Sequence, residues 1–305
     1  MVELAIASGK GGTGKTSLVG SLAALAGKAV LVDCDVDAAN LHLIINHKIL
    51  EKHDFSSSKR ASIIADKCTA CGICAEKCRF EAINYQNNSA AVQYQIDPLA
   101  CEGCGLCKRV CPEDAIAFAS VISGEWYKSE SDYGPFLHAR LGIAESNSGK
   151  LVSLLRQKAR EMAENKAYDF VIIDGPPGIG CPVIASITGV SYLLIVTEPS
   201  LSAIHDMTRL VDLAKHFRIR TGICINKYDI NPELSAKIEK FALADNIQTH
   251  GRIPFEPLFT EAQLKGKPYI AIANKEKAGV IENIWVSVKR ELNAIRDERL
   301  NKKAV

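Results

Sequence analysis

Eight of the eleven cysteines lie between Cys68 and Cys111, in two runs with the same spacing, C-x2-C-x2-C-x3-C. The second run repeats the first at an offset of 33 residues. In a run of this kind three thiolates wrap one cubane cluster, and the fourth cysteine ligates the cluster of the other run. Zinc sites use C-x2-C pairs that stand further apart. The spacing therefore predicts two [4Fe–4S] clusters.

The fourth cysteine of each run sets the predicted ligands. The first cluster is expected on Cys68, Cys71, Cys74 and Cys111, and the second on Cys101, Cys104, Cys107 and Cys78. This stretch resembles a bacterial-type two-cluster ferredoxin domain. It departs from the pattern at one position, because Cys111 is followed by the usual Pro112 but Cys78 is followed by Arg79. We expect the added positive charge to make the two cluster potentials unequal.

A glycine-rich octet lies between a short apolar run and a stretch of helical composition. Its sequence G-K-G-G-T-G-K-T fits G-x4-G-K-[ST], whose backbone N–H groups cradle phosphates at the start of a helix. Lys15 is expected to reach the β- and γ-phosphates, and Thr16 to bind Mg²⁺. The predicted nucleotide-binding residues of this loop are Gly9, Lys10, Gly11, Gly12, Thr13, Gly14, Lys15 and Thr16.

The early lysine, Lys10, distinguishes this loop from ordinary phosphate loops. The sequence resembles the deviant Walker A motif of the MinD/ParA/Mrp/nitrogenase-iron-protein class. The resemblance implies a homodimer in the ATP state, in which Lys10 reaches the phosphates of the partner subunit. The segment Leu31–Asp37 resembles the D-x-D switch I motif of the same class. It implies that Asp35 orients or deprotonates the attacking water, and that Asp33 helps to form the Mg²⁺ shell.

Three later segments extend the resemblance. The sequence from Val171 to Gly178 looks like Walker B and switch II, which implies that Asp174 holds Mg²⁺ through water and that the Gly178 N–H senses the γ-phosphate. Asn226 lies in a segment similar to the one that reads the adenine edge, and Pro254 in the loop that walls in the base. The catalytic residues implied are Lys10, Lys15 and Asp35, with ATP and Mg²⁺ as cofactors.

Strands and helices alternate on both sides of the cysteine region. Such alternation predicts a mostly parallel, doubly wound α/β sheet with helices on both faces. We expect a discontinuous P-loop ATPase domain at residues 1–59 and 119–305, and an inserted α+β ferredoxin-like domain at residues 60–118. The whole chain resembles MinD-superfamily ATPases that contain an inserted ferredoxin domain. Ser202 and the pair Asn231-Pro232 are expected to start two of the later helices.

The charge balance is nearly neutral, with 37 Lys and Arg against 35 Asp and Glu. It favours neither nucleic acid nor an anionic membrane as a partner. The uncharged stretch Gly175–Thr197 is interrupted by prolines, whereas a spanning helix needs about 20 mostly apolar residues. The N-terminus lacks the pattern of a signal peptide. We expect a cytoplasmic protein with little tendency to bind membranes.

An apolar stripe near the C-terminus has two interpretations. MinD proteins end in a membrane-binding amphipathic helix, but such a stripe more often faces the core of the protein. We favour the core interpretation. The stripe consists of Ile281, Ile284, Trp285, Val288, Leu292 and Ile295.

Three cysteines remain outside the two runs. Cys181 follows Asp174 by seven residues, the spacing of a cluster-ligating cysteine in the nitrogenase iron protein. A bridging cluster needs two cysteines per subunit, and only Cys34 and Cys224 remain. We expect these two in the core and Cys181 as a semi-buried residue at a helix start.

A nucleotide switch joined to two one-electron centres predicts an ATP-binding and ATP-hydrolysing iron–sulfur protein that couples the switch to electron transfer. Its expected partners are ATP and ADP, a second copy of the chain, and an unidentified redox or metallocofactor-maturation protein. One alternative is a Mrp-like iron–sulfur assembly ATPase, although no C-x2-C pair lies near the C-terminus. The other is a membrane- or DNA-positioning ATPase, which the near-neutral charge disfavours.

Overall fold

The computed structural model describes residues 1–303 except 28, 87–93 and 143–147, and it forms two compact units. The first unit contains residues 1–53, residues 126–140 and the chain from Ser148 onward. The second contains residues 54–125 and a short segment that begins at Leu141. No helix among the described residues combines the length and apolarity needed to cross a membrane.

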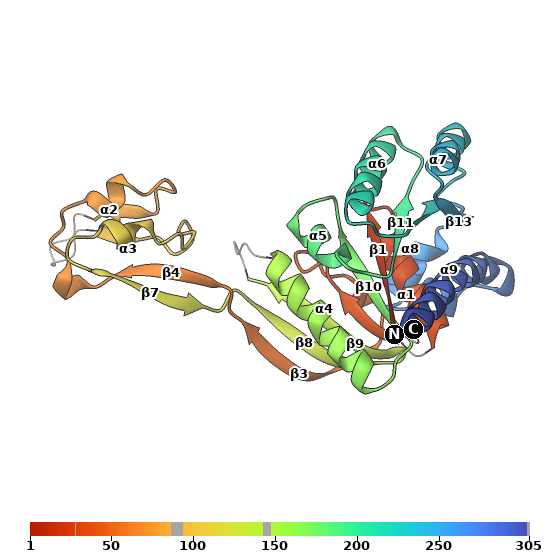
Figure 1. Ribbon diagram of the computed structural model, residues 1–305, viewed down its shortest axis with the longest axis horizontal. Coiled ribbons are helices and arrows are strands. Elements are labelled where there is room, and N and C mark those ends of the chain that lie inside the picture. Colours follow the sequence, from red (N-terminus) through yellow and green to blue (C-terminus); the bar gives the residue numbers. More distant parts are fainter. Residues whose placement is uncertain (28, 87–93, 143–147, 304–305) are drawn as a thin grey trace. The chain divides into compact units, whose positions relative to one another are not determined.

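A nine-stranded sheet forms the centre of the first unit (Figure 1). In spatial order its strands are β13 (Gln248–Ile253), β12 (Thr221–Asn226), β11 (Tyr192–Thr197), β1 (Val2–Ser8), β10 (Phe170–Pro177), β2 (Ala29–Asp33), β9 (Gly134–Leu141), β8 (Gly124–Ser131) and β3 (His47–Phe55). The seven strands from β13 to β9 pair in parallel. The prediction of an α/β fold with a mostly parallel sheet is therefore confirmed.

Helices cover both faces of this sheet, which explains why every residue of β1 is buried. Helices α1 (Lys15–Ala26) and α9 (Lys275–Lys303) pack on one face, and α4 (Ser148–Asn165), α5 (Cys181–Ile187) and α6 (Leu201–His216) on the other (Figure 1). The remaining helical elements are α7 (Pro232–Ala244), α8 (Leu258–Leu264), η1 (Leu41–Leu43) and η3 (Tyr269–Ala271).

The apolar stripe of α9 belongs to the core that α1 shares with the sheet. All six of its side chains are buried there, and Trp285 packs edge-on against Phe170 of β10. The core interpretation is therefore confirmed, and the alternative of a membrane-docking stripe is wrong for these residues. Cys34 and Cys224 are fully buried as predicted.

Two helix starts can be compared with the expectation. Asn231 caps α7, because its side-chain oxygen accepts a hydrogen bond from Leu234 N at 3.0 Å. The prediction for α6 is wrong by two residues. Ser200 is the residue whose Oγ accepts from Ala203 N, and Ser202 lies inside the first turn.

A buried carboxylate at the start of β1 joins three elements. Glu3 is 4% exposed, and its oxygens lie 3.3 Å from Arg156 Nη2 and 2.6 Å from Arg160 Nη2 on α4. Arg156 Nη1 also donates to the carbonyls of Ala185 and Thr188 at the end of α5. The cluster thus fixes α4 and α5 against the central strand.

The second unit is small and consists of two short ladders and two short helices. Strand β4 (Ser58–Ile63) pairs antiparallel with β7 (Ile116–Val121), and β5 (Ile83–Tyr85) with β6 (Tyr94–Ile96). Helices α2 (Ile73–Glu76) and α3 (Leu106–Val110) pack together and are drawn above the β4–β7 ladder in Figure 1. A short turn, η2 (Ala65–Lys67), precedes α2. The unit is wider than the 60–118 expected, because the β4–β7 ladder continues to Ser58 and Val121.

We expect Arg156→Ala to lower the free energy of unfolding by about 3 kcal/mol, because Glu3 and two buried carbonyls lose partners. Urea denaturation followed by circular dichroism measures the change. The matched control is Lys158→Ala on the same helix, which removes an exposed pair with Glu161 and should cost less than about 1 kcal/mol. Equal effects for the two variants would contradict a stabilising role for the buried cluster.

Candidate functional site

The loop between β1 and α1 lines a cavity of about 1250 Å³. Gly12 and Gly14 have φ values of 80° and 86°, a backbone region that favours glycine. A Cβ atom at Gly14 would also lie 2.3 Å from Asn226 Nδ2. The loop therefore requires glycine here both for its turn and for its close approach to β12. It leads into α1, whose N-terminus favours an anion.

The only charged side chain that this octet buries is Lys15, which is 6% exposed. Its Nζ atom lies 2.5 Å from Asp174 Oδ1 and 3.4 Å from Thr16 Oγ1. Burial by itself lowers the pKa of Lys15, but the carboxylates around it, Asp174 first, raise the pKa above its ordinary value. Lys15 is therefore positively charged in this cavity at neutral pH.

The second oxygen of Asp174 has no hydrogen-bond partner among the described residues, although it is buried. A buried carboxylate oxygen without a partner is costly unless a ligand satisfies it. Thr16 and Asp174 both lie within reach of Lys15 Nζ, so these two of the three predicted Mg²⁺ residues are close together. Hard oxygen donors of this kind suit Mg²⁺.

Asp33 and Asp35 stand at the end of β2 but have different environments. Asp33 is fully buried, and its oxygens accept hydrogen bonds from Asp35 N at 3.0 Å and Leu41 N at 3.1 Å. Burial and the neighbouring Asp174 raise the pKa of Asp33 to about 8. Asp33 thus shapes the loop, and its place in the Mg²⁺ shell stays a prediction.

Asp35, in contrast, lines the cavity beside the phosphate loop. Partial burial raises the pKa of Asp35 above its ordinary value. A carboxylate that faces the cavity with a raised pKa is suited to accept a proton. The role of Asp35 toward an attacking water stays a prediction.

Lys10 is held within its own chain. Its Nζ atom lies 2.7 Å from Glu198 Oε1 and 3.2 Å from Ser200 Oγ. Glu198 also binds Lys227 at 2.9 Å, and Lys227 donates to the Gly12 carbonyl at 3.0 Å. The contact of Lys10 with phosphates of a partner subunit requires a second copy of the chain, so it stays a prediction.

A second cavity, of about 540 Å³, adjoins the first along the loop and contains the predicted base-binding residues Asn226 and Pro254. Asn226 Nδ2 donates to the Thr13 carbonyl at 2.7 Å, so this side chain also fastens the loop to β12. Phe255, the next residue of the loop expected to wall in the base, lines the same cavity. Sequence reasoning missed the lining residues that follow it, which are Glu256, Phe259, Thr260 and Gln263.

Gly178 ends the segment predicted as switch II, and its φ of 92° again favours glycine. Its N–H donates to the Ser8 carbonyl at 2.9 Å. Contact with a γ-phosphate would therefore require this backbone bond to open.

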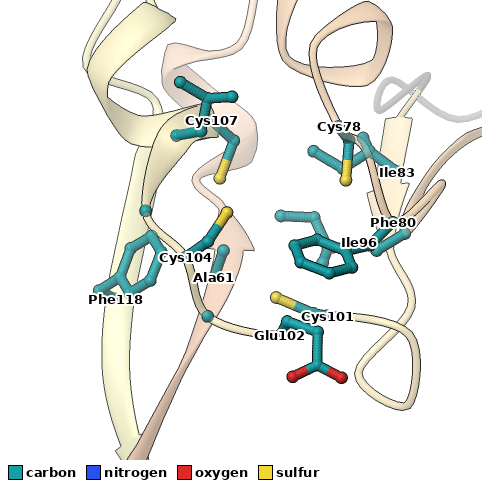
Figure 2. Close-up of a pocket in the computed structure, with 14 residues that line it drawn as sticks. Ala61, Cys78, Phe80, Ile83, Ile96, Cys101, Glu102, Cys104, Cys107 and Phe118 are labelled. Atoms are coloured by element: carbon teal, nitrogen blue, oxygen red, sulfur yellow. The ribbon is translucent and has the colours of Figure 1, made fainter.

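In the second unit the eight cysteines gather in two sets of four. The Cys78 pocket, a cavity of about 350 Å³, contains Cys78, Cys101, Cys104 and Cys107. Figure 2 shows that their sulfur atoms point into a common space. The Cys68 pocket, of about 340 Å³, contains Cys68, Cys71, Cys74 and Cys111. The fold thus brings together the same two sets that the spacing predicts, with the fourth cysteine of each run crossing to the other.

The backbone of the two runs repeats as the sequence does. Equivalent residues share positive φ angles in the turns around each set, which shapes the two pockets alike. The pairs are Ala70 and Gly103 (55° and 65°), Gly72 and Gly105 (77° and 79°), and Glu81 and Asp114 (52° and 46°).

No group of three His, Cys, Asp or Glu side chains in the described part of the chain is close enough to hold a single metal ion. Cys181, at the start of α5, is exposed rather than semi-buried as expected. It is therefore solvent-accessible, as are Cys71 and Cys104.

Comparison with solved structures supports the α/β fold with its mostly parallel sheet. MinD of Pyrococcus horikoshii, solved with Mg-ADP, is 18% identical with a TM-score of 0.54, and covers 94% of this chain and 95% of its own. An ATP complex of McdA from Cyanothece is 14% identical with a TM-score of 0.56, and the match covers 95% of this chain and 96% of McdA. At these identities the likeness concerns the fold.

Relatives by sequence come from Methanocaldococcus jannaschii. One uncharacterized protein is 37% identical over 237 residues, which are 76% of this chain and 80% of the relative. A second is 24% identical over 277 residues, which are 88% and 92%. The model of the CobQ/CobB/MinD/ParA nucleotide binding domain matches residues 4–269. With its phosphate loop, buried Lys15–Asp174 pair and parallel sheet, the chain belongs to this nucleotide-binding family.

Proposed function

We propose that this protein is an ATP-hydrolysing switch that carries two [4Fe–4S] clusters and couples its nucleotide state to electron transfer. The observation that carries the proposal is the gathering of eight cysteines into two pockets of nearly equal volume in a chain that also has a nucleotide cavity. Neither feature alone separates this protein from a plain ATPase or from a plain electron carrier.

The nucleotide cavity contains the groups that phosphoryl transfer needs. The loop N–H groups and Lys15 neutralise phosphate charge, and the free oxygen of Asp174 together with Thr16 would hold Mg²⁺. Asp35 faces the cavity and would orient water and accept its proton. The adjoining cavity at Asn226 and Pro254 would take the base.

Two contacts of the structure would change when ATP binds. The Gly178 N–H now bonds to Ser8, and Lys10 is held by Glu198. A γ-phosphate in each of two facing subunits would compete for both groups, which is how phosphate contacts order switch loops. The loop after β2 leads through η1 into β3, whose last residues belong to the second unit. Movement of this loop therefore has a direct covalent route to the cysteine unit.

The cysteine pockets suit iron–sulfur clusters better than zinc. Zinc sites use C-x2-C pairs that stand further apart in the sequence than the cysteines of these two runs. In a four-iron cluster each thiolate binds its own iron, which suits a run whose fourth cysteine crosses to the other set. When bound, such clusters supply one-electron transfer at low potential. The cysteines hold them, and the apolar residues Ala82, Ile83, Ala115 and Ile116 exclude water beside them.

We expect Asp35→Asn to reduce kcat for ATP hydrolysis by roughly 10²- to 10⁴-fold while nucleotide affinity stays nearly unchanged, because the amide cannot accept the proton of the attacking water. Phosphate release and a fluorescent ATP analogue measure the two quantities. The control Asp37→Asn changes an exposed carboxylate two residues away that does not line the cavity. An unchanged kcat in the Asp35→Asn variant would show that Asp35 is not a catalytic residue.

Anaerobically purified protein should contain about eight iron and eight sulfide per chain, which is two clusters of four. Cys104→Ala should reduce both to about half, because only the Cys78 pocket loses a ligand. Cys181→Ala is the matched control, since Cys181 is equally exposed and lies in neither pocket. Wild-type protein without iron, or equal losses in both variants, would contradict the assignment.

Coupling between the two activities predicts a spectroscopic change. The EPR signal of the dithionite-reduced protein should differ between the ADP and ATP states, because nucleotide-dependent loop movement alters the surroundings of the clusters. Lys15→Gln should abolish the difference without removing iron. Identical spectra in both nucleotide states of the wild-type protein would leave the two activities uncoupled.

A further inference from the structure

The internal repeat allows the two cysteine pockets to be compared position by position. The offset of 33 residues that relates the cysteines also pairs Thr69 with Glu102 and Phe80 with Glu113. Thr69 and Glu113 line the Cys68 pocket, whereas Glu102 and Phe80 line the Cys78 pocket. Each pocket thus has one carboxylate, so the carboxylates do not distinguish them. The differences lie in hydrogen-bond donors and aromatic rings.

The Cys68 pocket has donors that the other lacks. Tyr94 lines it, and a methyl group at Gly72 would lie 2.8 Å from the Tyr94 hydroxyl oxygen, so this hydroxyl lies over the turn between Cys71 and Cys74. A methyl group at the equivalent Gly105 would have no neighbour within 4 Å.

The sulfur atoms themselves also differ between the two pockets. In the Cys68 pocket, Ala115 N donates to Cys111 Sγ at 3.3 Å. The equivalent residues Ala82 and Cys78 form no such bond in the part of the chain that the structure describes. Hydrogen bonds to the sulfurs are one of the main influences on the potential of a bound cluster.

Apolar side chains make up most of the lining of the Cys78 pocket beside its cysteines. Phe80, Ile96 and Phe118 surround it, and Figure 2 shows that the Glu102 carboxylate points away from the four sulfur atoms. The Arg79 guanidinium lies over the Phe80 ring at 4.7 Å. Arg79 is exposed, so the high dielectric of the solvent weakens its charge.

Reduction adds a negative charge to a group that four thiolates already hold. Hydrogen-bond donors stabilise this charge, and an apolar enclosure disfavours it. We propose that the two sites have unequal reduction potentials, that the Cys68 site accepts the first electron, and that the Tyr94 hydroxyl raises its potential. The inference rests on the proposed function, namely that both pockets hold clusters. One electron from a one-electron donor reduces the site, with no bond made or broken and no proton transferred.

An EPR-monitored potentiometric titration of the anaerobically purified full chain tests this, with dithionite as reductant. The wild-type protein should show two one-electron steps at different midpoints. Tyr94→Phe should move the higher midpoint to lower potential and leave the other in place. Tyr85→Phe is the matched control, because that ring packs against Tyr94 but is exposed and lines neither pocket. It should leave both midpoints unchanged.

A second variant tests the opposite pocket without removing any group. Phe118→Tyr adds a hydroxyl beside the Cys78 pocket and should raise the lower midpoint towards the higher one. Coincident midpoints in the wild-type protein, or a shift of the lower midpoint in Tyr94→Phe, would overturn the inference. If the protein in these experiments still contains about eight iron per chain, such results overturn only this inference and not the proposed function. Protein without iron would overturn both.

Discussion

Lys15 and Asp174 form an ion pair that is buried between the phosphate loop and the end of β10, and the organisation of the nucleotide cavity depends on it. Two carboxylates, Asp33 and Asp174, stand at the ends of adjacent strands with little access to water. Burial and the neighbouring Asp174 raise the pKa of Asp33, and the buried charge of Asp174 would be disfavoured without a cation beside it. Lys15 supplies that cation, and its position in turn fixes the start of α1 and the turn of the glycine loop. Substrate phosphate and Mg²⁺ would enter a site whose charges are already balanced.

A few polar contacts also hold the loops around the cavity that would respond to nucleotide. Asp33 holds the loop after β2 through Leu41, Ser8 holds Gly178, and Glu198 holds Lys10. Gly178 is held by one backbone bond, and Lys10 is a partly exposed side chain held by polar contacts, so neither belongs to the apolar core. Contacts of this kind can be exchanged for contacts to phosphate at small cost, whereas the apolar packing of β1 cannot. The structure thus has a rigid sheet with replaceable contacts at its carboxyl edge.

The second unit differs from the first in that it has too few apolar side chains to form a core. Its two short ladders and short helices surround the cysteine pockets, and few side chains beyond Ala61, Ala82, Ile83, Ala115 and Ile116 are buried. Small domains of this type commonly rely on metal centres for stability. The two cysteine runs share their backbone turns as well as their spacing, whereas the side chains that line the two pockets differ.

The sequence by itself determined the features that short-range chemistry dictates. The glycine octet, the acidic strand ends and the cysteine spacing each act over a few residues, so their positions could be assigned without a fold. The sequence also predicted strands β1, β10 and β11 from their apolar runs, and the core face of α9 from its apolar stripe. Burial on both faces of a sheet, or on one face of a helix, leaves a clear apolar pattern.

Tertiary structure decided what depends on distant partners. Strands β3, β8 and β9 were not expected, since their mixed polar sequences, such as HKILEKHDF, lack the apolar runs of the central strands. Phe259 and Gln263 line the cavity beside Asn226 because α8 folds back towards the phosphate loop, where Gln263 Nε2 donates to Ser17 Oγ. Lys10 is bound by Glu198, and the Tyr94 hydroxyl lies over Gly72, through contacts between residues far apart in the chain. Local sequence encodes the chemistry of a motif, but its surroundings come from packing, which no local pattern records.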